Sequence, residues 1–411
     1  MRTIFFIAQR LLGDKDNKNK ISSPIIKISF VSIAIGMIII LISLATGKGL
    51  QHKIREKISA FSGHILIINF DTNQSGLTLE PISIRQNFYP KFENIKGIKN
   101  VQAFATIGGI IRTEKDFEGI VFKGVDSLYD WEIFKPYLIQ GKIPHFNLKK
   151  TNDSVLISQT IANRLHLKLH DKFNAYFMRK GSQKPQLRIL KISGIYDSGF
   201  DDFDKTFLLG DLRMVQKLYK WPDTLTGGFE IILNDFNQID EKTNEIYEQI
   251  GSTLNTISIK EKYPMIFNWV QMFDFNILMI LVIIIFIAGL NMITTLLVMI
   301  LEKRQFIAVM KVLGMTNWQL QKIFLIQSAY IISIGLFFGN LIGLGLIFIQ
   351  KYFGIIRLDP ETYYVRVAPV FINLKYIIML NIGIMSAILL MLLLPVLVIS
   401  QISPVKVLKY D

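Results

Sequence analysis

The sequence contains no cysteine, which excludes disulfide bonds, thiol chemistry and cysteine-ligated metal sites. It also lacks a Gly-x4-Gly-Lys-Ser/Thr phosphate-binding loop, so any ATP must be bound and hydrolysed by another chain. No nucleophile elbow and no pair of carboxylates with supporting context occurs in it. We therefore predict that the chain is not an enzyme, has no catalytic residues and binds no cofactor or metal of its own.

Two groups of possible metal ligands are present, and neither has the spacing of a metal site. His166 and His170 are four residues apart and precede Asp171, but residues 165–172 read as a helix end that turns into a strand. The two imidazoles therefore need not share a face. Four aspartates between residues 197 and 204 could attract a cation, yet they lack the ordered ligand positions of a calcium loop. A solvated turn is the expected structure there.

Charged residues and histidine are absent from four long stretches of the chain. Each is long enough to cross the hydrocarbon core of a bilayer, which takes about 20 helical residues. Hydrophobic residues make up 51% of the sequence and the mean hydropathy is +0.37, which is too apolar for an ordinary soluble protein. We predict four transmembrane helices, within the uncharged residues 28–47, 275–301, 323–350 and 376–405.

The distribution of Lys and Arg predicts which side of the membrane each segment occupies. The amino-terminal tail carries six such residues up to Lys27, and the short segments 302–322 and 351–375 carry four each. These two segments have equal numbers of Lys and Arg, so the basic amino-terminal tail sets the orientation. Both termini are therefore predicted in the cytoplasm, with residues 48–274 outside. The first stretch has a long apolar core and no clean cleavage site, so we expect an uncleaved anchor. The net charge of +14 comes without a basic stripe interleaved with aromatic residues, and nucleic acid is not an expected partner.

Between the first and second uncharged stretches, strand-like and helix-like runs alternate, with glycine and proline at the breaks. This pattern predicts a large α+β domain outside the membrane. An apolar face at helical spacing over residues 4–12 predicts an amphipathic helix in the inner interface. The expected segments are an amphipathic helix (1–23), transmembrane helix 1 (24–47), the outer domain (48–274), transmembrane helix 2 (275–301), a cytoplasmic helix (302–318), transmembrane helix 3 (319–350), a short outer loop (351–375), transmembrane helix 4 (376–400) and a cytoplasmic tail (401–411).

Several residues inside the uncharged stretches have structural meaning. Gly335, Gly339 and Gly343 recur every four residues of the third stretch, a spacing that lets a neighbouring helix approach closely. Pro395 lacks a backbone donor and is expected to kink the fourth helix. Polar side chains in the second stretch either bond to a neighbouring helix or line a wet cavity; they belong to Asn291, Thr294 and Thr295.

The segment EKRQFIAVMKVLGMTNW follows the second stretch directly. Phe306, Val309, Met310 and Leu313 fall on one face of a helix, and Gly314 is a natural helix stop. Such a short amphipathic helix either docks into a groove of a partner protein or packs against its own helix bundle. The residues alone do not separate these two alternatives.

This segment and the following KIFLIQSAYIISIGLFFGNLIG resemble the coupling region of the FtsX-like permeases, a four-helix class of ABC transporter subunits. Within this FtsX-like, MacB-type family, the resemblance is closest to the LolC/LolE-type lipoprotein-releasing permeases. It implies four transmembrane helices plus a large, MacB-like periplasmic α+β domain inserted between helices 1 and 2, in the bacterial inner membrane. Further matching pieces are residues 6–11 with 30–47, SGIYDSGF at 193–200 with Asp204, DPETYYVRVAP at 359–369, Gln327, and the ending SPVKVLKYD with Lys409.

The resemblance implies a transport subunit that is driven mechanically by a partner. A dimeric ABC ATPase, which holds ATP and Mg²⁺, would move the coupling helix, and transmembrane helix 2 would carry this movement to the periplasmic domain. A lipoprotein held by its acyl chains between helices 1 and 2 of two permease subunits, the same chain or a sister chain, would leave the membrane lipid for a periplasmic chaperone. The coupling residues implied are Glu302, Lys303, Arg304, Phe306, Met310, Lys311 and Gly314.

Helical spacing and the resemblance together select the walls of the substrate cavity, namely Val31, Ile35, Ile38, Ile42, Phe275, Leu278, Met279 and Val282. The hairpin that hooks the chaperone in LolC-type permeases corresponds here to the short, basic residues 178–188. Candidate contacts are Arg179, Lys184 and Arg188. Two other functions stay open: export of another amphiphile, such as a peptide or antibiotic, and transmission of force to periplasmic partners without transport.

Overall fold

The computed structural model describes residues 22–71, 77–78, 80–114, 116–146, 151–179 and 184–402. The expected amphipathic helix at 1–23 therefore lies almost entirely outside the described residues, as does the ending with Lys409. The chain divides into two compact units. The helical unit comprises Met1–Gln51, Val270–Arg357 and Val367–Asp411, and the sheet unit comprises His52–Trp269 and Leu358–Arg366.

Among the described residues, four helical segments are long and apolar enough to cross a membrane. The fourth contains Pro395 and is interrupted two residues later, at Leu397. A short helix, α10 (Arg304–Val312), joins the second segment to the third. The four segments are α2 (Ser22–Ser62), α9 (Pro264–Glu302), α11 (Asn317–Phe353), and α13 (Leu374–Val396) with α14 (Val398–Gln401).

The glycine stripe of α11 packs against α2. A Cβ added at Gly339 would stand 2.6 Å from the Met37 Cβ and 2.9 Å from the carbonyl oxygen of Ala34. The other two glycines are equally close to α2: a Cβ at Gly335 or Gly343 would stand 2.9 Å or 3.0 Å from its nearest neighbour. The close approach predicted from the four-residue spacing is confirmed, and α2 is its partner.

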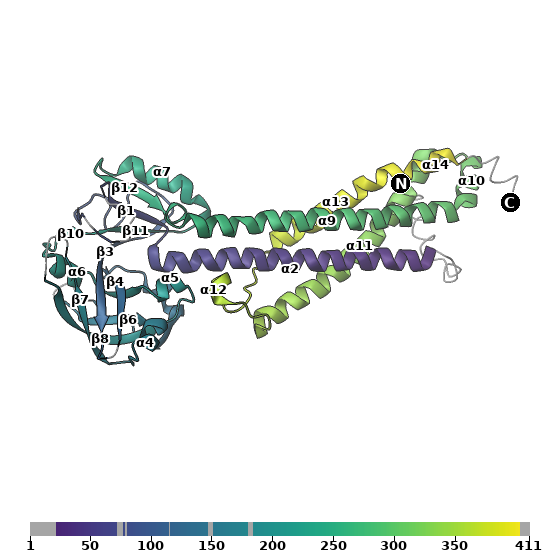
Figure 1. Cartoon of the computed structure of the whole chain (residues 1–411). Coiled ribbons are helices and arrows are strands. Elements are labelled where there is room, and N and C mark those ends of the chain that lie inside the picture. Colours follow the sequence, from purple (N-terminus) through teal and green to yellow (C-terminus); the bar gives the residue numbers. More distant parts are fainter. Residues whose placement is uncertain are drawn as a thin grey trace. The chain divides into compact units, whose positions relative to one another are not determined.

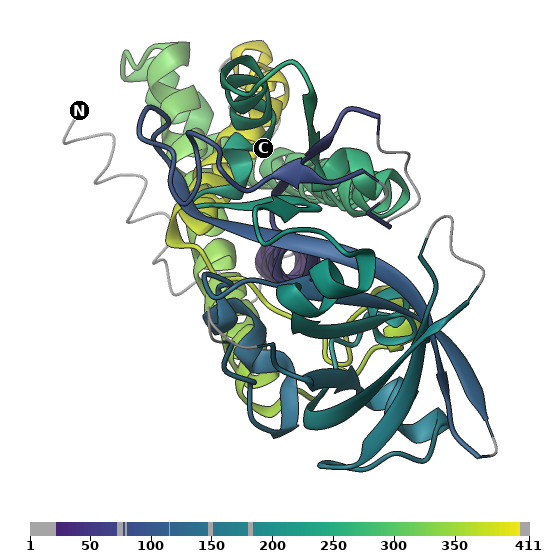
Figure 2. The ribbon, with the colours of Figure 1, turned by 90° about the vertical axis from the view of Figure 1, so that its left-hand side faces the viewer.

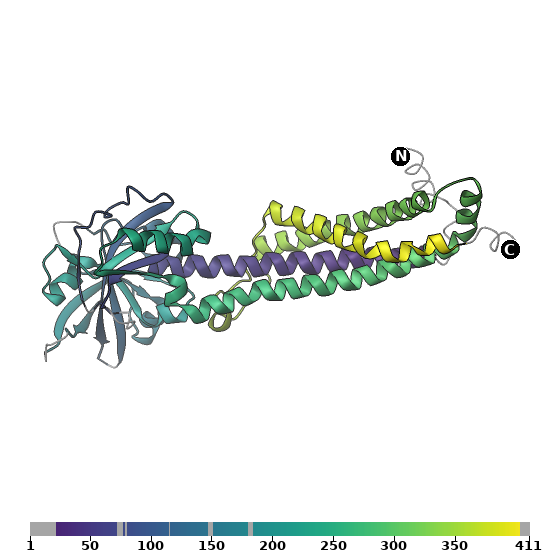
Figure 3. The same cartoon turned by 90° about the horizontal axis from the view of Figure 1, so that it is seen from above.

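Helix α2 does not stop at Gly47. A Cβ at Gly47 would stand 2.7 Å from Ile277 of α9, and one at Gly49 would stand 2.4 Å from the carbonyl oxygen of Pro369. These glycines are therefore sites of close packing rather than a helix end, and the helix runs on to Ser62. Figures 1 and 3 show α9 alongside α2. Because both helices extend past Gln51 and Val270, each belongs partly to the helical unit and partly to the sheet unit.

The described strands lie between α2 and α9 in the sequence, and ten of them form one sheet in the order β12-β1-β11-β3-β4-β9-β6-β8-β5, with β7 pairing β3 and β8. The β4–β9 and β6–β8 pairs are parallel. Figure 2 shows the long strand β3 crossing the unit. The strands are β1 (Ile65–Asn69), β2 (Ile82–Ser83), β3 (Ile98–Arg112), β4 (Phe117–Val125), β5 (Leu138–Gly141), β6 (Ser154–Ser158), β7 (Lys172–Phe177), β8 (Gln186–Tyr196), β9 (Phe207–Asp211), β10 (Leu225–Thr226), β11 (Gly228–Leu233) and β12 (Leu254–Ser258). The helices of this unit are α3 (Trp131–Phe134), α4 (Gln159–Arg164), α5 (Asp201–Asp204), α6 (Leu212–Tyr219), α7 (Ile239–Gln249), α8 (Ile259–Lys262) and α12 (Pro360–Tyr363).

Candidate functional site

An apolar groove of about 500 Å³ lies between α2 and α9 in the helical unit. Gly36 brings the two helices together there, because a Cβ at this residue would stand 2.6 Å from Ile284. Lys27 is the charged residue of the lining. A groove of this composition suits a hydrocarbon chain better than a polar molecule. The full lining is Lys27, Ile28, Val31, Ser32, Ile35, Gly36, Ile39, Ile284, Ile287 and Ala288.

On α2, two of the four predicted cavity residues line the groove and two do not. Val31 and Ile35 line the groove. The Cα of Ile38 lies 3.4 Å from a Cβ placed at Gly343 of α11, and Ile42 packs against the buried core of the bundle. The prediction placed the residue after Ile35 three positions on, at Ile38. In the structure the next exposed residue is four positions on, at Ile39. Sequence spacing therefore missed two residues of this stripe, Ile28 and Ile39.

On α9, the groove residues lie about two helical turns further along the chain than predicted. Ile284, Ile287 and Ala288 line the groove. Only 17% of the most apolar part of α9 is buried, against 33–39% for the other three segments, so this part of α9 has the largest uncovered share of the four. The predicted residues are exposed on that surface outside the groove lining: Phe275, Leu278, Met279 and Val282.

Polar contacts hold α2 against α9 on both sides of Gly36. Towards the start of α2, Asn291 Nδ2 donates to Ser32 Oγ at 2.8 Å, and the hydroxyls of Ser29 and Thr295 share a hydrogen bond. Asn291 and Thr295 thus bond to the neighbouring helix, one of the two alternatives left open by the sequence. Thr294 donates within α9, to the carbonyl oxygens of Leu290 and Asn291.

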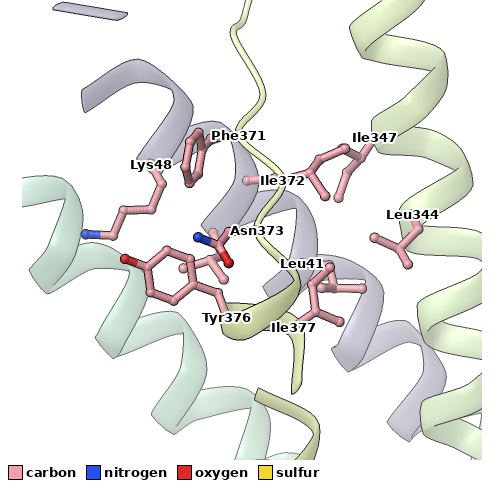
Figure 4. A pocket seen from close by; sticks show the side chains of 11 residues that line it. Leu41, Lys48, Leu344, Ile347, Phe371, Ile372, Asn373, Tyr376 and Ile377 are labelled. Atoms are coloured by element: carbon pink, nitrogen blue, oxygen red, sulfur yellow. The ribbon is translucent and has the colours of Figure 1, made fainter. Parts of the chain in front are cut away.

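Further along α2, Lys48 Nζ lies 2.6 Å from Asp274 Oδ1 of α9. The Gln51 amide donates to the Val270 carbonyl at 3.1 Å. Lys48 also borders a small cavity between α2, α11 and the start of α13, where Figure 4 shows it with Phe371 and Tyr376. Its volume is about 10 Å³, which is at most enough for one water molecule. A cavity of this size is too small for a substrate, so the groove is the better candidate site.

The second candidate site is α10 with the turn that follows it. Phe306 and Met310 pack against the bundle core, so part of the predicted apolar face is used internally. Gly314 has φ +91°, the left-handed conformation expected of a helix stop. Other apolar residues of the segment stay exposed by 43–73%: Val309, Val312, Leu313 and Trp318. Val312 and Trp318 were missed, although large apolar residues at a helix end are a readable signal.

The charged coupling residues are placed around the start and the end of α10. Glu302 ends α9, Lys303 occupies the N-cap position of α10 without a side-chain capping bond, and Arg304 is the first residue of α10. Lys311 Nζ donates to the carbonyl oxygens of Ile399 and Ile402 at 2.7 and 2.8 Å. Lys311 therefore caps the end of α14 and fixes α10 against the fourth segment, rather than pointing to a partner.

In the sheet unit, the last turn of α2 is bound firmly by sheet residues. Tyr129 Oη donates to the Ala60 carbonyl at 2.8 Å, and Lys123 Nζ donates to the Phe61 carbonyl. Lys123 also pairs with Glu230, and the side chains of both are at most 3% exposed. Burial lowers the pKa of Lys123, and the Glu230 carboxylate opposes this shift. The paired cation satisfies the Phe61 carbonyl at the negative end of the helix dipole.

The remaining sequence candidates lie in the sheet unit. Arg179 follows β7, while Lys184 and Arg188 lie before and within β8, the strand that pairs with β7. Residues 180–183 between them lie outside the described range. His166 and His170 each have positive φ, in turns rather than on a helix face. Within the described residues, no group of three or more His, Asp or Glu side chains is placed to hold a metal ion.

Comparison with known proteins relates both units to membrane permeases. The MacB-like periplasmic core domain family matches residues 28–246, more than half of the chain, and the FtsX-like permease C-terminal family matches residues 278–404. A lipoprotein-releasing system transmembrane protein LolC of Buchnera aphidicola is 21% identical over 93% of both chains. A LolE protein of Haemophilus influenzae is 22% identical over 79% of this chain and 77% of that one.

A solved structure was also matched, the periplasmic region of MacB from Actinobacillus actinomycetemcomitans. It is 12% identical and covers 50% of this chain and 92% of its own, with a TM-score of 0.31. That score is too low to carry an argument, so the kinship of the chain rests on the two family matches.

Proposed function

Because the chain belongs to the FtsX-like permeases that carry a MacB-like periplasmic core domain, we propose that it is the permease subunit of an ABC transporter that releases lipoproteins. It extracts them from the outer leaflet of the inner membrane and passes them to a periplasmic chaperone. A separate ATPase dimer, which binds ATP and Mg²⁺, drives the extraction. Two relatives named as lipoprotein-releasing proteins support this substrate class.

The observation that carries the proposal is the apolar groove between α2 and α9. Burying a methylene group contributes about 0.8 kcal/mol, so an acyl chain of about a dozen methylenes costs on the order of 10 kcal/mol to expose to water. A lipoprotein with several chains will not leave a bilayer unaided. The groove offers an apolar surface to those chains, and both of its helices continue in the chain to residues of the sheet unit.

The force enters at α10. Its exposed Val309, Val312 and Leu313 offer an apolar surface to a partner ATPase, while Lys311 ties the helix to α14. Movement then passes along α9 and α2. The last turn of α2 is bound to the sheet unit by Lys123 and Tyr129. A firm attachment is what a lever needs, because a loosely held helix end would absorb the displacement.

A second permease subunit completes the transporter. The uncovered surface of α9, which includes Phe275 and Met279, is available for a partner chain or for substrate. The chaperone would be met by the hairpin of β7 and β8 with Arg179, Lys184 and Arg188, on the periplasmic side.

Site-specific photo-crosslinking tests the groove. A photoreactive residue in place of Ile35 or Ile287 should capture lipoprotein in membranes, because both side chains line the groove. Ile342 of α11 is the matched control, being 49% exposed against 51% for Ile35 and 50% for Ile287 but outside the lining. Equal capture at all three residues would contradict a groove site.

Depletion of the protein tests the substrate class. Lipoproteins should then accumulate in the inner membrane. Normal sorting of lipoproteins after depletion would contradict the lipoprotein proposal. Capture of a peptide or another amphiphile by the photoreactive residue at Ile35 would favour export of that molecule. Absence of any captured molecule, with a periplasmic protein bound instead, would favour force transmission without transport.

A further inference from the structure

The chain passes between the helical unit and the sheet unit at four points, after Gln51, Trp269, Arg357 and Arg366. The last two enclose Leu358–Arg366, which joins α11 to α13 in sequence yet packs with the sheet unit. We propose that this segment, the docked loop, is a third mechanical attachment that stays bound throughout the transport cycle and makes α11 and α13 move the sheet unit as α2 and α9 do. The inference rests on the proposed function for its role in release.

Aromatic contacts hold the docked loop. The Tyr364 ring lies 4.8 Å from the Phe200 ring and 5.8 Å from the Trp269 ring, centroid to centroid. Tyr363 also reaches Trp269, at 6.2 Å. Phe200 is completely buried, whereas Tyr364 is half-buried, so the contact joins the loop to the core of the sheet unit. Figure 1 shows α12, which precedes Tyr364, near α5, which follows Phe200.

Polar contacts fix the register of the docked loop. Lys57 Nζ of α2 donates to the Tyr364 carbonyl at 2.8 Å, and Arg366 forms an ion pair with Asp197. The Leu358 amide donates to the Arg366 carbonyl at 3.0 Å and closes the loop on itself. Because the Arg366 side chain is 68% exposed, this ion pair contributes little stability and mainly fixes the position of the loop along the sheet unit.

The backbone on both sides of the contact is held in an uncommon conformation. Tyr364 has φ +59°, a left-handed conformation that disfavours a bulky side chain and persists only when its surroundings fix it. Opposite it, Gly199 has φ +61°, and a Cβ there would stand 2.8 Å from Lys57 Nζ. Asp204 accepts hydrogen bonds from the amides of Ser198 and Gly199 and so orders this turn. The turn is therefore built to receive the loop and the lysine together.

Three attachments thus meet at one site: Lys57 from α2, Trp269 from α9 and Tyr364 from the docked loop. None of these residues is in the groove lining, so their role is to position the sheet unit and not to touch substrate. We expect Tyr364 to be the main positioning residue, because its ring contacts both the buried Phe200 ring and the Trp269 ring.

A tether tests whether the loop stays docked. The chain has no cysteine of its own, so a pair introduced as Asp197→Cys and Arg366→Cys can be joined by a short bis-maleimide, which alkylates both thiols, in the full transporter complex. We expect the tether to form with and without ATP, and the tethered complex to release lipoprotein at the rate of the untreated pair. Loss of release on tethering would overturn the inference, since the loop would then have to leave its site.

Replacing the ring tests the contact itself. Tyr364→Ala should lower lipoprotein release by about tenfold with the complex still assembled, and Tyr364→Phe should keep it, because the ring and not the hydroxyl makes the contacts. Hydrogen exchange at residues 198–200, across the contact, should rise in Tyr364→Ala and not in the control Tyr352→Ala, whose side chain is 87% exposed. Unchanged exchange there would refute docking, and unchanged release with raised exchange would refute the mechanical role. If the unmodified protein releases no lipoprotein, the proposed function fails while the exchange result still decides the docking.

Discussion

Gly36 of α2 lies so close to Ile284 of α9 that a Cβ on residue 36 would be 2.6 Å from the Ile284 side chain. This approach shapes the groove, because both residues belong to its lining. Any side chain at residue 36 must either push α9 away or occupy the groove.

We therefore predict that Gly36→Leu impairs substrate capture and destabilises the helical packing by about 1–3 kcal/mol, the usual cost of overpacking. Photo-crosslinking at Ile287 and thermal unfolding in detergent measure the two effects. Gly345→Leu is the control, because a Cβ at Gly345 has no neighbour within 4 Å. Equal effects of the two substitutions would show that the close approach is unimportant.

The exposed end of α10 gives a prediction about coupling. Leu313→Asp should abolish most of the stimulation of a partner ATPase and leave the permease folded, because this side chain is 73% exposed. Met310→Ala should instead lower stability, since Met310 packs against the bundle core. ATPase activity of the reconstituted complex and thermal unfolding of the permease separate the two outcomes.

Ile139→Asp, at an exposed apolar residue of β5, is the matched control for a general effect of the added charge. It should leave ATPase stimulation unchanged. Full stimulation in Leu313→Asp would remove α10 from the docking surface.

The buried ion pair at the end of α2 gives a prediction about stability. Lys123→Met leaves the Glu230 carboxylate buried without its partner and should cost about 3–5 kcal/mol, whereas the double variant Lys123→Met with Glu230→Gln should recover much of that loss. Denaturant unfolding followed through tryptophan fluorescence measures both. If the double variant is no better than the single one, the capping of the Phe61 carbonyl, not the unpaired charge, is the larger effect.

His64 gives a prediction about pH. Its Nδ1 accepts a hydrogen bond from the Leu233 amide at 2.8 Å, which requires the neutral ring, and burial, aided by the Lys99 charge, lowers its pKa from 6.5 to about 4. A lowered pKa in the folded state means that the unfolded chain binds the proton more tightly. The stabilisation is therefore complete above pH 6.5 and is lost as the pH falls towards 4, by about 3 kcal/mol in total.

Unfolding of the protein at pH 7 and pH 4.5 measures this loss. His64→Asn can keep an acceptor for the Leu233 amide but cannot take up a proton, so its stability should change less between the two pH values. An equal change in both proteins would assign the pH dependence to other groups.

Much of the helical unit could be predicted from the sequence. The four charge-free stretches correspond to the four long helical segments, and the glycine stripe at Gly335, Gly339 and Gly343 is in close contact with α2. These features are local, because length, hydropathy and a four-residue period can be read along a single helix. The exposed residues of α10 follow partly from the same periodicity.

The face of each helix was harder to predict. Ile38 and Ile42 were assigned to the cavity from spacing, but neither lines the groove, and Ile42 packs against the bundle core. Ile28 and Ile39 take their place in the exposed stripe. In a membrane helix the lipid-facing and core-facing positions are equally apolar. The helical period of apolar residues therefore does not predict which face of the helix packs against a neighbouring helix.

The sequence by itself determined that four apolar helices exist, that no thiol or phosphate-binding loop is present and that glycines mark close helix contacts. Only the tertiary structure decided that Gly47 and Gly49 lie inside a continuous α2, and that Lys57, Phe200 and Tyr364 meet although they are far apart in the chain. The physical reason is the range of the interactions: hydropathy and period act within one helix, whereas a hydrogen bond to a carbonyl or a ring contact depends on where the whole chain has folded.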